Sequence, residues 1–227
     1  MMSDVGNELV VIVPMLKRAH RVDPLIESIT ANTDCDHTIL FVATDDDTAV
    51  IDAIETHPEV RLETIPANTI GDYAKKINHG YRSSTEPFLF LGADDLRFHP
   101  GWWPAARRRF GTNPRVGVVG TQDKANRRVI AGRHATHSVV SRRYAEDHGT
   151  IDHPGAVLHE GYLHEFVDDE FVGTAKSRGA FVFEHASVVE HLHPAVGKAP
   201  MDAMYAAQGS RMRIDRRTFL QRQHLWL

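Results

Sequence analysis

The sequence of 227 residues has a single cysteine, Cys35, and no apolar run near the roughly 20 residues of a membrane-spanning helix. One cysteine cannot form an internal disulfide, and the first residues, MMSDVGNELV, lack the basic start and long apolar segment of a secretory leader. We therefore expect a soluble protein of the reducing cytoplasm, without a transmembrane segment. No sequence feature predicts its oligomeric state.

A large excess of one charge is also missing. The net charge of -4 at pH 7 argues against a strong general attraction to nucleic acid, although arginine clusters at 107–109, 142–143 and 211–217 could form local basic patches. The length suits one large α/β domain or two small ones, and the hydrophobic share of 42% is near that of globular proteins. We favour one domain.

Three common nucleotide or metal motifs are absent. The loop at 14–21 has no glycine, so it lacks the fingerprint of dinucleotide-binding enzymes. The segment GTAKS at 173–177 lacks the second glycine of a P-loop. His164 follows His159 and Glu160 one position too late for the HExxH motif of zinc peptidases. A dehydrogenase, a P-loop enzyme and a zincin are therefore poor interpretations.

The first half of the chain alternates between strand and helix patterns. β-Branched and apolar runs predict strands at 9–13, 38–43, 60–65 and 88–91, and apolar residues at helical spacing predict helices at 24–31, 49–56 and 72–82. Such alternation requires a parallel sheet with right-handed crossovers. We predict a Rossmann-like, mostly parallel sheet flanked by helices.

The second half is less regular. It predicts helices at 102–110 and 169–176, strands at 116–119, 180–184 and 188–191, and an irregular, His- and Arg-rich stretch at 129–140. Residues 201–227 read as a helical tail. We expect a single domain over residues 1–200 that is followed by this tail.

The strongest candidate site follows the strand predicted at 88–91. Gly92 and Ala93 permit a tight turn, which leaves Asp94 and Asp95 at the carboxyl end of a buried strand, where open α/β sheets bind ligands. Adjacent carboxylates repel each other unless a cation offsets their charge, so a hard metal that carries phosphate oxygens suits them. A solvated acidic turn is the plain alternative.

Four segments in this order resemble the nucleotide-binding half of glycosyltransferase family 2, which has the GT-A fold. They are the strand that ends at Pro14, the acidic loop TDDDT, the helical segment with Asn68, Gly71, Asn78 and Gly80, and the sequence GADD at 92–95. The resemblance implies a nucleotide-binding half at about 9–100 and an acceptor-binding half at about 101–200. It also implies nucleotide-binding roles for Pro14, Arg18, Asp45, Asp46, Asp47, Asn78 and Asp94.

The same resemblance implies a divalent cation, Mn²⁺ or Mg²⁺, on the diphosphate. Its ligands would be Asp94 and Asp95, together with His191 and His193, which share one face of a strand because they are two residues apart. The chain departs from the family at Gly92, where the metal motif DxD has its first acid.

The segment DDEF at 168–171, followed by Arg178 and Gly179, resembles the acidic pair that precedes a helix in this family. The aspartate of that pair is the base in inverting members, which implies Asp169 as the base, with Asp168 and Glu170 as alternatives. A helix N-cap is the structural alternative for Asp169.

The resemblance as a whole implies a metal-dependent, inverting glycosyltransferase. It would move a sugar from a nucleotide-diphosphate sugar, with UDP or GDP as the leaving group, to an acceptor glycan, protein or modified nucleic acid. Two alternatives remain open. They are a sugar-phosphate nucleotidyltransferase, against which the glycine-free first loop argues, and a catalytically silent nucleotide-binding module. Lys75, Lys76 or Arg18 could add positive charge near the phosphates, although a helical lysine more often faces solvent.

Overall fold

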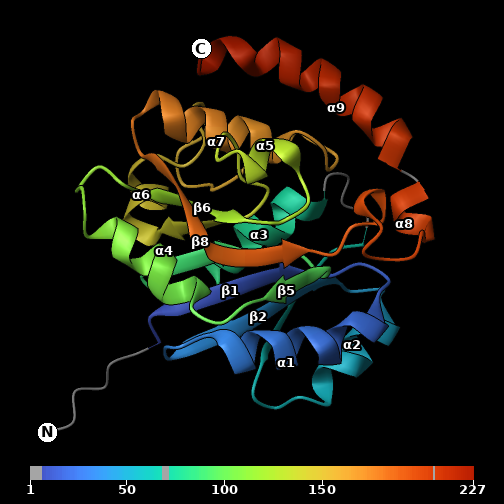
Figure 1. Cartoon of the computed structure of the whole chain (residues 1–227). Coiled ribbons are helices and arrows are strands. Elements are labelled where there is room, and N and C mark those ends of the chain that lie inside the picture. Colours follow the sequence, from blue (N-terminus) through green and yellow to red (C-terminus); the bar gives the residue numbers. More distant parts are fainter. Residues whose placement is uncertain (1–6, 68–71, 207) are drawn as a thin grey trace, which may run out of the picture.

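The computed structural model describes residues 7–67, 72–206 and 208–227, so Asn68 and Gly71, two positions of the helical segment that resembles the family, lie outside the described residues. The described chain forms a single α/β domain (Figure 1). Its first half contains β1 (Leu9–Pro14), α1 (Val22–Asn32), β2 (His37–Thr44), α2 (Thr48–Glu55), β3 (Arg61–Ile65), α3 (Asp72–Arg82), β4 (Phe88–Leu91) and β5 (Leu96–Phe98).

The second half begins with α4 (Trp102–Phe110). After α4, the chain forms in order β6 (Val118–Gln122), α5 (Arg127–Ile130), β7 (Ser138–Ser141), α6 (Arg142–Asp147), α7 (Val167–Ser177), β8 (Phe181–His191) and its last two α-helices, α8 (Ala203–Ala206) and α9 (Gln208–Arg222). No helix in the described ranges combines the length and apolar character needed to span a membrane.

The strands form one sheet in the order β3-β2-β1-β4-β7-β6-β8-β5. Strands β3, β2, β1 and β4 are parallel to one another, as the alternating pattern predicted. Strand β7 is antiparallel to both β4 and β6, β8 is parallel to β6, and β5 is antiparallel to β8. The sheet is therefore mostly parallel, with an antiparallel strand inserted at its centre.

Two apolar layers cover the two faces of the sheet. Because successive residues of a strand point to opposite faces, Leu9, Val11 and Val13 of β1 pack toward α1, α2 and α4, whereas Val10 and Ile12 pack toward α3, α6 and α7. All six residues of β1 are buried, which explains its continuous apolar sequence. Trp102 and Trp103 also lie in the core rather than in a sugar site.

Several predicted elements need correction. The stretch 129–140, predicted as irregular, holds the last turn of α5 and most of β7. The strands predicted at 180–184 and 188–191 are one strand, β8, whose register shifts opposite Thr121 and Gln122. Strand β5 was not predicted, because its three residues follow the turn after β4 directly and carry no alternation long enough to detect.

The predicted helical tail is confirmed as helix, and α9 lies beside α7 (Figure 1). Phe219 of α9 stacks on Phe166 with the ring centroids 5.2 Å apart. Arg222 pairs with Glu170 of α7 at 2.6 Å and with Asp152 at 2.7 Å. The contacts with Phe166 and Glu170 join the tail to the segment that contains the predicted catalytic base.

Asp215 anchors α9 from a fully buried position. Its carboxylate accepts hydrogen bonds from the backbone N–H groups of Leu163, His164 and Glu165 at 2.8, 2.9 and 2.7 Å. Replacing Asp215 with alanine leaves these donors unsatisfied, so we expect the free energy of unfolding in urea to fall by about 1–3 kcal/mol. Arg216→Ala, at an exposed neighbour, should change it by less than about 0.5 kcal/mol, and equal effects would contradict this anchoring role.

Candidate active site

The candidate site lies where the order of the sheet reverses. The chain leaves β1 toward β2 and β3 on one side, and later returns to place β4 on the other side of β1. Ligands in open α/β sheets bind in the crevice at such a switch point, beyond the carboxyl ends of the strands. Pro14, at the end of β1, and Asp94, after β4, are therefore neighbours at this edge.

A cavity of about 490 Å³ opens at this edge, a size typical of small-molecule sites. Its walls bring together the ends of β1, β4 and β8, the start of α7 and the C-terminal segment. The predicted site residues that line it are Pro14, Arg18, Asp94, Asp95, Asp168, Asp169, His191 and His193.

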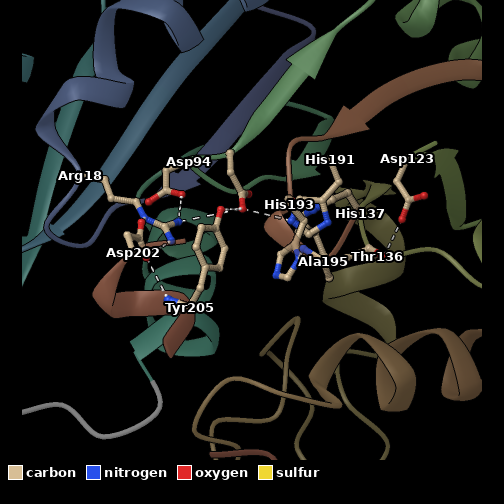
Figure 2. A network of polar contacts seen from close by, with 12 residues as sticks. Arg18, Asp94, Asp123, Thr136, His137, His191, His193, Ala195, Asp202 and Tyr205 are labelled. Carbon is tan, nitrogen blue, oxygen red and sulfur yellow. Dashed lines mark hydrogen bonds and ion pairs between the residues drawn. The ribbon is translucent and has the colours of Figure 1, made fainter. Parts of the chain in front are cut away.

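Arg18 holds the first wall of the cavity together. Its Nη1 lies 2.7 Å from Asp94, while its Nε and Nη2 reach the two carboxylate oxygens of Asp202 at 2.9 and 3.1 Å. The guanidinium also lies 4.1 Å from the ring centre of Tyr205. Figure 2 shows Arg18 between Asp94 and Asp202 with the Tyr205 ring against it. Arg18 is thus a buried cation with paired charges.

Asp95 is held by a different set of groups. Its Oδ2 lies 3.2 Å from His191 Nε2 and accepts a hydrogen bond from the Tyr205 hydroxyl at 2.6 Å. The pairing of Leu96 with His191 between β5 and β8 explains why residues 96 apart in the sequence meet here. His191 therefore lies beside the acidic pair, as the sequence predicted.

The two carboxylates differ in acidity. Burial and the neighbouring Asp95 raise the pKa of Asp94 to about 6, although Arg18 acts in the opposite direction. Burial alone would raise the pKa of Asp95, but the hydrogen bond and charge of His191, with the Tyr205 hydroxyl, hold it well below its usual range. Despite its burial, His191 has a raised pKa because it pairs with Asp95. Asp95 therefore loses its proton at a lower pH than Asp94.

Two further histidines lie in the cavity wall (Figure 2). His137 is only 4% exposed, and its Nδ1 lies 3.0 Å from the carbonyl oxygen of Leu91, while its Nε2 has no hydrogen-bond partner among the described residues. Burial and the nearby His191 lower the pKa of His137 to about 4. His193 follows β8, and its Nδ1 accepts the N–H of Ala195 at 3.1 Å.

Gly92 stands where the family motif has an acid because the backbone leaves no room there. A Cβ atom at this position would lie 2.6 Å from the carbonyl oxygen of Ile12. We expect both Gly92→Ala and Gly92→Asp to lower the free energy of unfolding by about 1–3 kcal/mol, because neither residue fits without a backbone shift. Gly111→Ala, whose Cβ would meet its nearest atom at 3.6 Å, is the matched control. A stable Gly92→Asp variant that binds metal more tightly would contradict this explanation.

The opposite wall carries the second acidic pair, at the start of α7. Asp168 lies 3.0 Å from His134 Nε2, and Asp169 pairs with Arg128 of α5 at 2.7 Å. Burial would raise the pKa of Asp168, but the hydrogen bond and charge of His134 lower it. Burial and the charge of Asp168 instead raise the pKa of Asp169. Asp169 is therefore the better proton acceptor near neutral pH.

Two groups of described residues place three potential metal ligands within 4.8 Å of one another, and each already contains a cation or a paired imidazole. One is His134 with Asp168 and Asp169, described above. The other is Asp152, His159 and Glu170, where the guanidinium of Arg222 pairs with both carboxylates. Arg222 thus supplies the positive charge that the second group needs.

The remaining predicted nucleotide-binding residues do not line the cavity. Asp45 accepts the N–H of Ala67, and Asp47 accepts the N–H of Lys17, so both shape loops near the site, while Asp46 is exposed.

Asn78 is fully buried away from the cavity. Its amide oxygen accepts the N–H groups of Val157 and Leu158, and its amide nitrogen donates to Glu160 and to the Leu158 carbonyl. Every polar atom of the Asn78 side chain is therefore occupied by the 157–160 segment, which gives it a bracing position rather than a ligand-facing one.

Lys76 is a cavity residue whose importance the sequence underestimated. Its side chain is 1% exposed, donates to the Met15 carbonyl at 2.5 Å and pairs with Asp72 at 2.8 Å. The spacing of Ala74, Lys76 and Ile77 gives no indication that the lysine faces inward, because a helical lysine usually faces solvent. Only the close approach of α3 to the loop after β1 reveals it.

The first wall can accept a divalent cation. Asp94, Asp95 and His191 offer carboxylate oxygens and an imidazole nitrogen, a mixture that suits Mn²⁺ and, through the oxygens, Mg²⁺. These carboxylates are buried, and the charges that now offset them come from Arg18 and His191. The residues present therefore fit the cation that the sequence led us to expect.

The fold is that of the GT-A glycosyltransferases. The chain is similar to a mannosyltransferase from Pyrobaculum calidifontis solved with GDP-Man and Mn²⁺, with 17% identity and a TM-score of 0.67, over 94% of this chain and 63% of that one. It is also similar to glucosyl-3-phosphoglycerate synthase from Mycobacterium tuberculosis solved with Mn²⁺, UDP and glucosyl-3-phosphoglycerate, with 13% identity and a TM-score of 0.66, over 96% and 80%. The chain thus spans less than two thirds of the mannosyltransferase.

The sequence profile described as "Glycosyl transferase family 2" matches residues 10–164, and the chain belongs to this family. No protein of curated function matches the sequence. The membership confirms the resemblance that the four N-terminal segments indicated.

Proposed function

We propose that this chain transfers a sugar from a nucleotide-diphosphate sugar to an acceptor hydroxyl, with inversion at the anomeric carbon and with a requirement for Mn²⁺ or Mg²⁺. One observation carries the proposal. Asp94 and Asp95, which suit a cation, and Asp168 and Asp169, which suit a base, line the same cavity at the switch point of the sheet. Family membership supports the same reaction.

The donor side of the cavity would bind the diphosphate. Asp94, Asp95 and His191 would hold the cation, which when bound would neutralise charge on the leaving diphosphate. Arg18 lies beside these carboxylates, and its guanidinium would bind a phosphate oxygen. If a diphosphate replaced Asp94 as the partner of Arg18, the guanidinium would still be paired with the carboxylate of Asp202.

The acceptor side would remove the proton from the attacking hydroxyl. We assign this step to Asp169, since its pKa is raised, while Asp168 is held in its charged form by His134. Arg128 pairs with Asp169 from the solvent side and orients its carboxylate. Attack by an acceptor activated at this wall, on the face opposite the diphosphate, would invert the anomeric centre.

The donor is proposed as a UDP- or GDP-sugar, and the acceptor as a glycan, protein or modified nucleic acid. The similar solved proteins were crystallised with GDP-Man or with UDP, which supports the first assignment. We assign the nucleotide half to about 9–100 and the acceptor half to about 101–200, because the two acidic pairs fall on either side of that division.

The test is turnover of UDP-glucose and GDP-mannose with Mn²⁺, with Mg²⁺ and with EDTA. We expect slow release of one free nucleoside diphosphate that EDTA abolishes, and NMR of the sugar product should show an inverted anomer. Release of pyrophosphate from a nucleoside triphosphate and a sugar phosphate would instead identify a nucleotidyltransferase. Calorimetry that detects no binding of UDP or GDP under any metal condition would overturn the proposal.

A further inference from the structure

The first wall of the cavity, which carries Arg18, Asp94, Asp95 and His191, is called the metal wall below. It contains one imidazole, that of His137, besides those of His191 and His193 that the sequence indicated. His137 ends the loop before β7, and the antiparallel pairing of β7 with β4 brings it beside Leu91, three residues before Asp94. The rings of His137 and His191 have their centroids 5.4 Å apart, and those of His191 and His193 are 5.2 Å apart. Either outer histidine could therefore join His191 around a cation.

The hydrogen bonds of the two outer histidines distinguish them. A carbonyl oxygen only accepts, so His137 Nδ1, at 3.0 Å from Leu91 O, must carry the proton. The other nitrogen of a neutral ring then has a free lone pair. His193 is the reverse, because its Nδ1 accepts the N–H of Ala195 and its Nε2 therefore holds the proton in the neutral ring. Only His137 is in the tautomer that binds a metal through Nε2.

The surroundings of His137 also match those of a metal ligand. Histidines that bind metals usually donate their second N–H to a carbonyl or carboxylate, which fixes the ring. His137 has this bond to Leu91, and its Nε2 is buried without a hydrogen-bond partner in a cavity wall. A buried nitrogen without a partner destabilises the folded chain, so such an atom in a native site needs an explanation.

We propose that His137 is a ligand of the divalent cation, together with Asp94, Asp95 and His191, and that His193 is not. The inference rests on the proposed metal-dependent function and names a residue that this function did not include. The donors of Asp95 and His191 are now 3.2 Å apart and share a hydrogen bond, so the cation would replace the shared proton.

Asparagine substitutions give a matched test. In His137→Asn, the amide nitrogen can keep the bond to Leu91 O while the Nε2 lone pair is lost. In His193→Asn, the amide oxygen can keep the bond from Ala195 N–H. Free Mn²⁺ is measured by electron paramagnetic resonance during titration of the full chain, with and without UDP or GDP. We expect His137→Asn to weaken Mn²⁺ binding at least about tenfold, and His193→Asn to change it less than about twofold.

A second measurement needs only the wild-type chain. Pulsed electron paramagnetic resonance of bound Mn²⁺ should detect two coordinated imidazole nitrogens, and the His193→Asn variant should keep both. One nitrogen in the wild type, normal Mn²⁺ binding by a folded His137→Asn variant, or loss of binding in His193→Asn would each overturn this inference while leaving metal-dependent transfer standing. A wild-type chain that binds no Mn²⁺ with any nucleotide would overturn the metal requirement as well.

Discussion

Replacing Asp169 with asparagine should lower kcat for sugar transfer by about 10²–10⁴-fold, the usual contribution of a general base. Asparagine has nearly the same shape but cannot accept the proton of the acceptor hydroxyl. The donor binds at the other wall, so its affinity should not change. Initial rates with saturating donor, together with calorimetric titration of the nucleoside diphosphate, measure both quantities.

Asp168→Asn is the informative comparison, because the two aspartates are adjacent and both line the cavity. His134 keeps Asp168 charged and Asp168 in turn raises the pKa of Asp169, so this variant should lower the rate less and shift the acidic limb of the pH–rate profile to lower pH. A full loss of activity in Asp168→Asn with near-normal activity in Asp169→Asn would place the base on Asp168.

Replacing Asp94 with asparagine should reduce the Mn²⁺-dependent part of nucleoside diphosphate affinity by at least about tenfold. The variant removes a charged oxygen donor from the metal wall and leaves the shape of the loop nearly unchanged. It also frees Arg18, whose guanidinium now pairs with this carboxylate at 2.7 Å. Binding without metal should therefore persist, and Arg18 should support it.

Asp52→Asn is the control for the loss of one negative charge, since Asp52 is exposed on α2 and does not line the cavity. It should bind the diphosphate like the wild type at every Mn²⁺ concentration. If Asp94→Asn retains the full metal dependence while Asp95→Asn loses it, then Asp95 alone supplies the essential carboxylate.

The features that sequence reasoning located are those set by short stretches of chain. Asp94 and Asp95 could be placed at a strand end because four apolar residues, at 88–91, and then Gly92 and Ala93 precede them in the sequence. The acidic pair at the start of α7 was instead found through the resemblance of the segment at 168–171 to the family. Both pairs line the cavity, which confirms where they lie; their chemical roles stay predictions.

The features that it missed depend on pairing between distant segments. Strand β7 lies between β4 and β6 in the sheet. Its position depends on pairing with β4, which is about fifty residues earlier in the sequence. His137 comes with β7, so no local pattern could connect it with Leu91. Tyr205 similarly reaches Asp95 from 110 residues away. Asn78 shows a different limit of sequence reasoning. Its position in the family motif predicted contact with a nucleotide, but its side chain forms hydrogen bonds with the 157–160 segment.

The ion pair between Arg18 and Asp202 joins residues that are 184 positions apart. At a synthesis rate of about 5–20 residues per second, roughly 10–40 s separate the appearance of these two side chains on a ribosome. Strands β1 to β4 can pair during that interval, but Asp94 and Asp95 then lack the imidazole, hydroxyl and second carboxylate that complete their wall. We therefore expect the nascent chain to fold its nucleotide half first and to acquire ligand binding only after Asp202 and Tyr205 have been made.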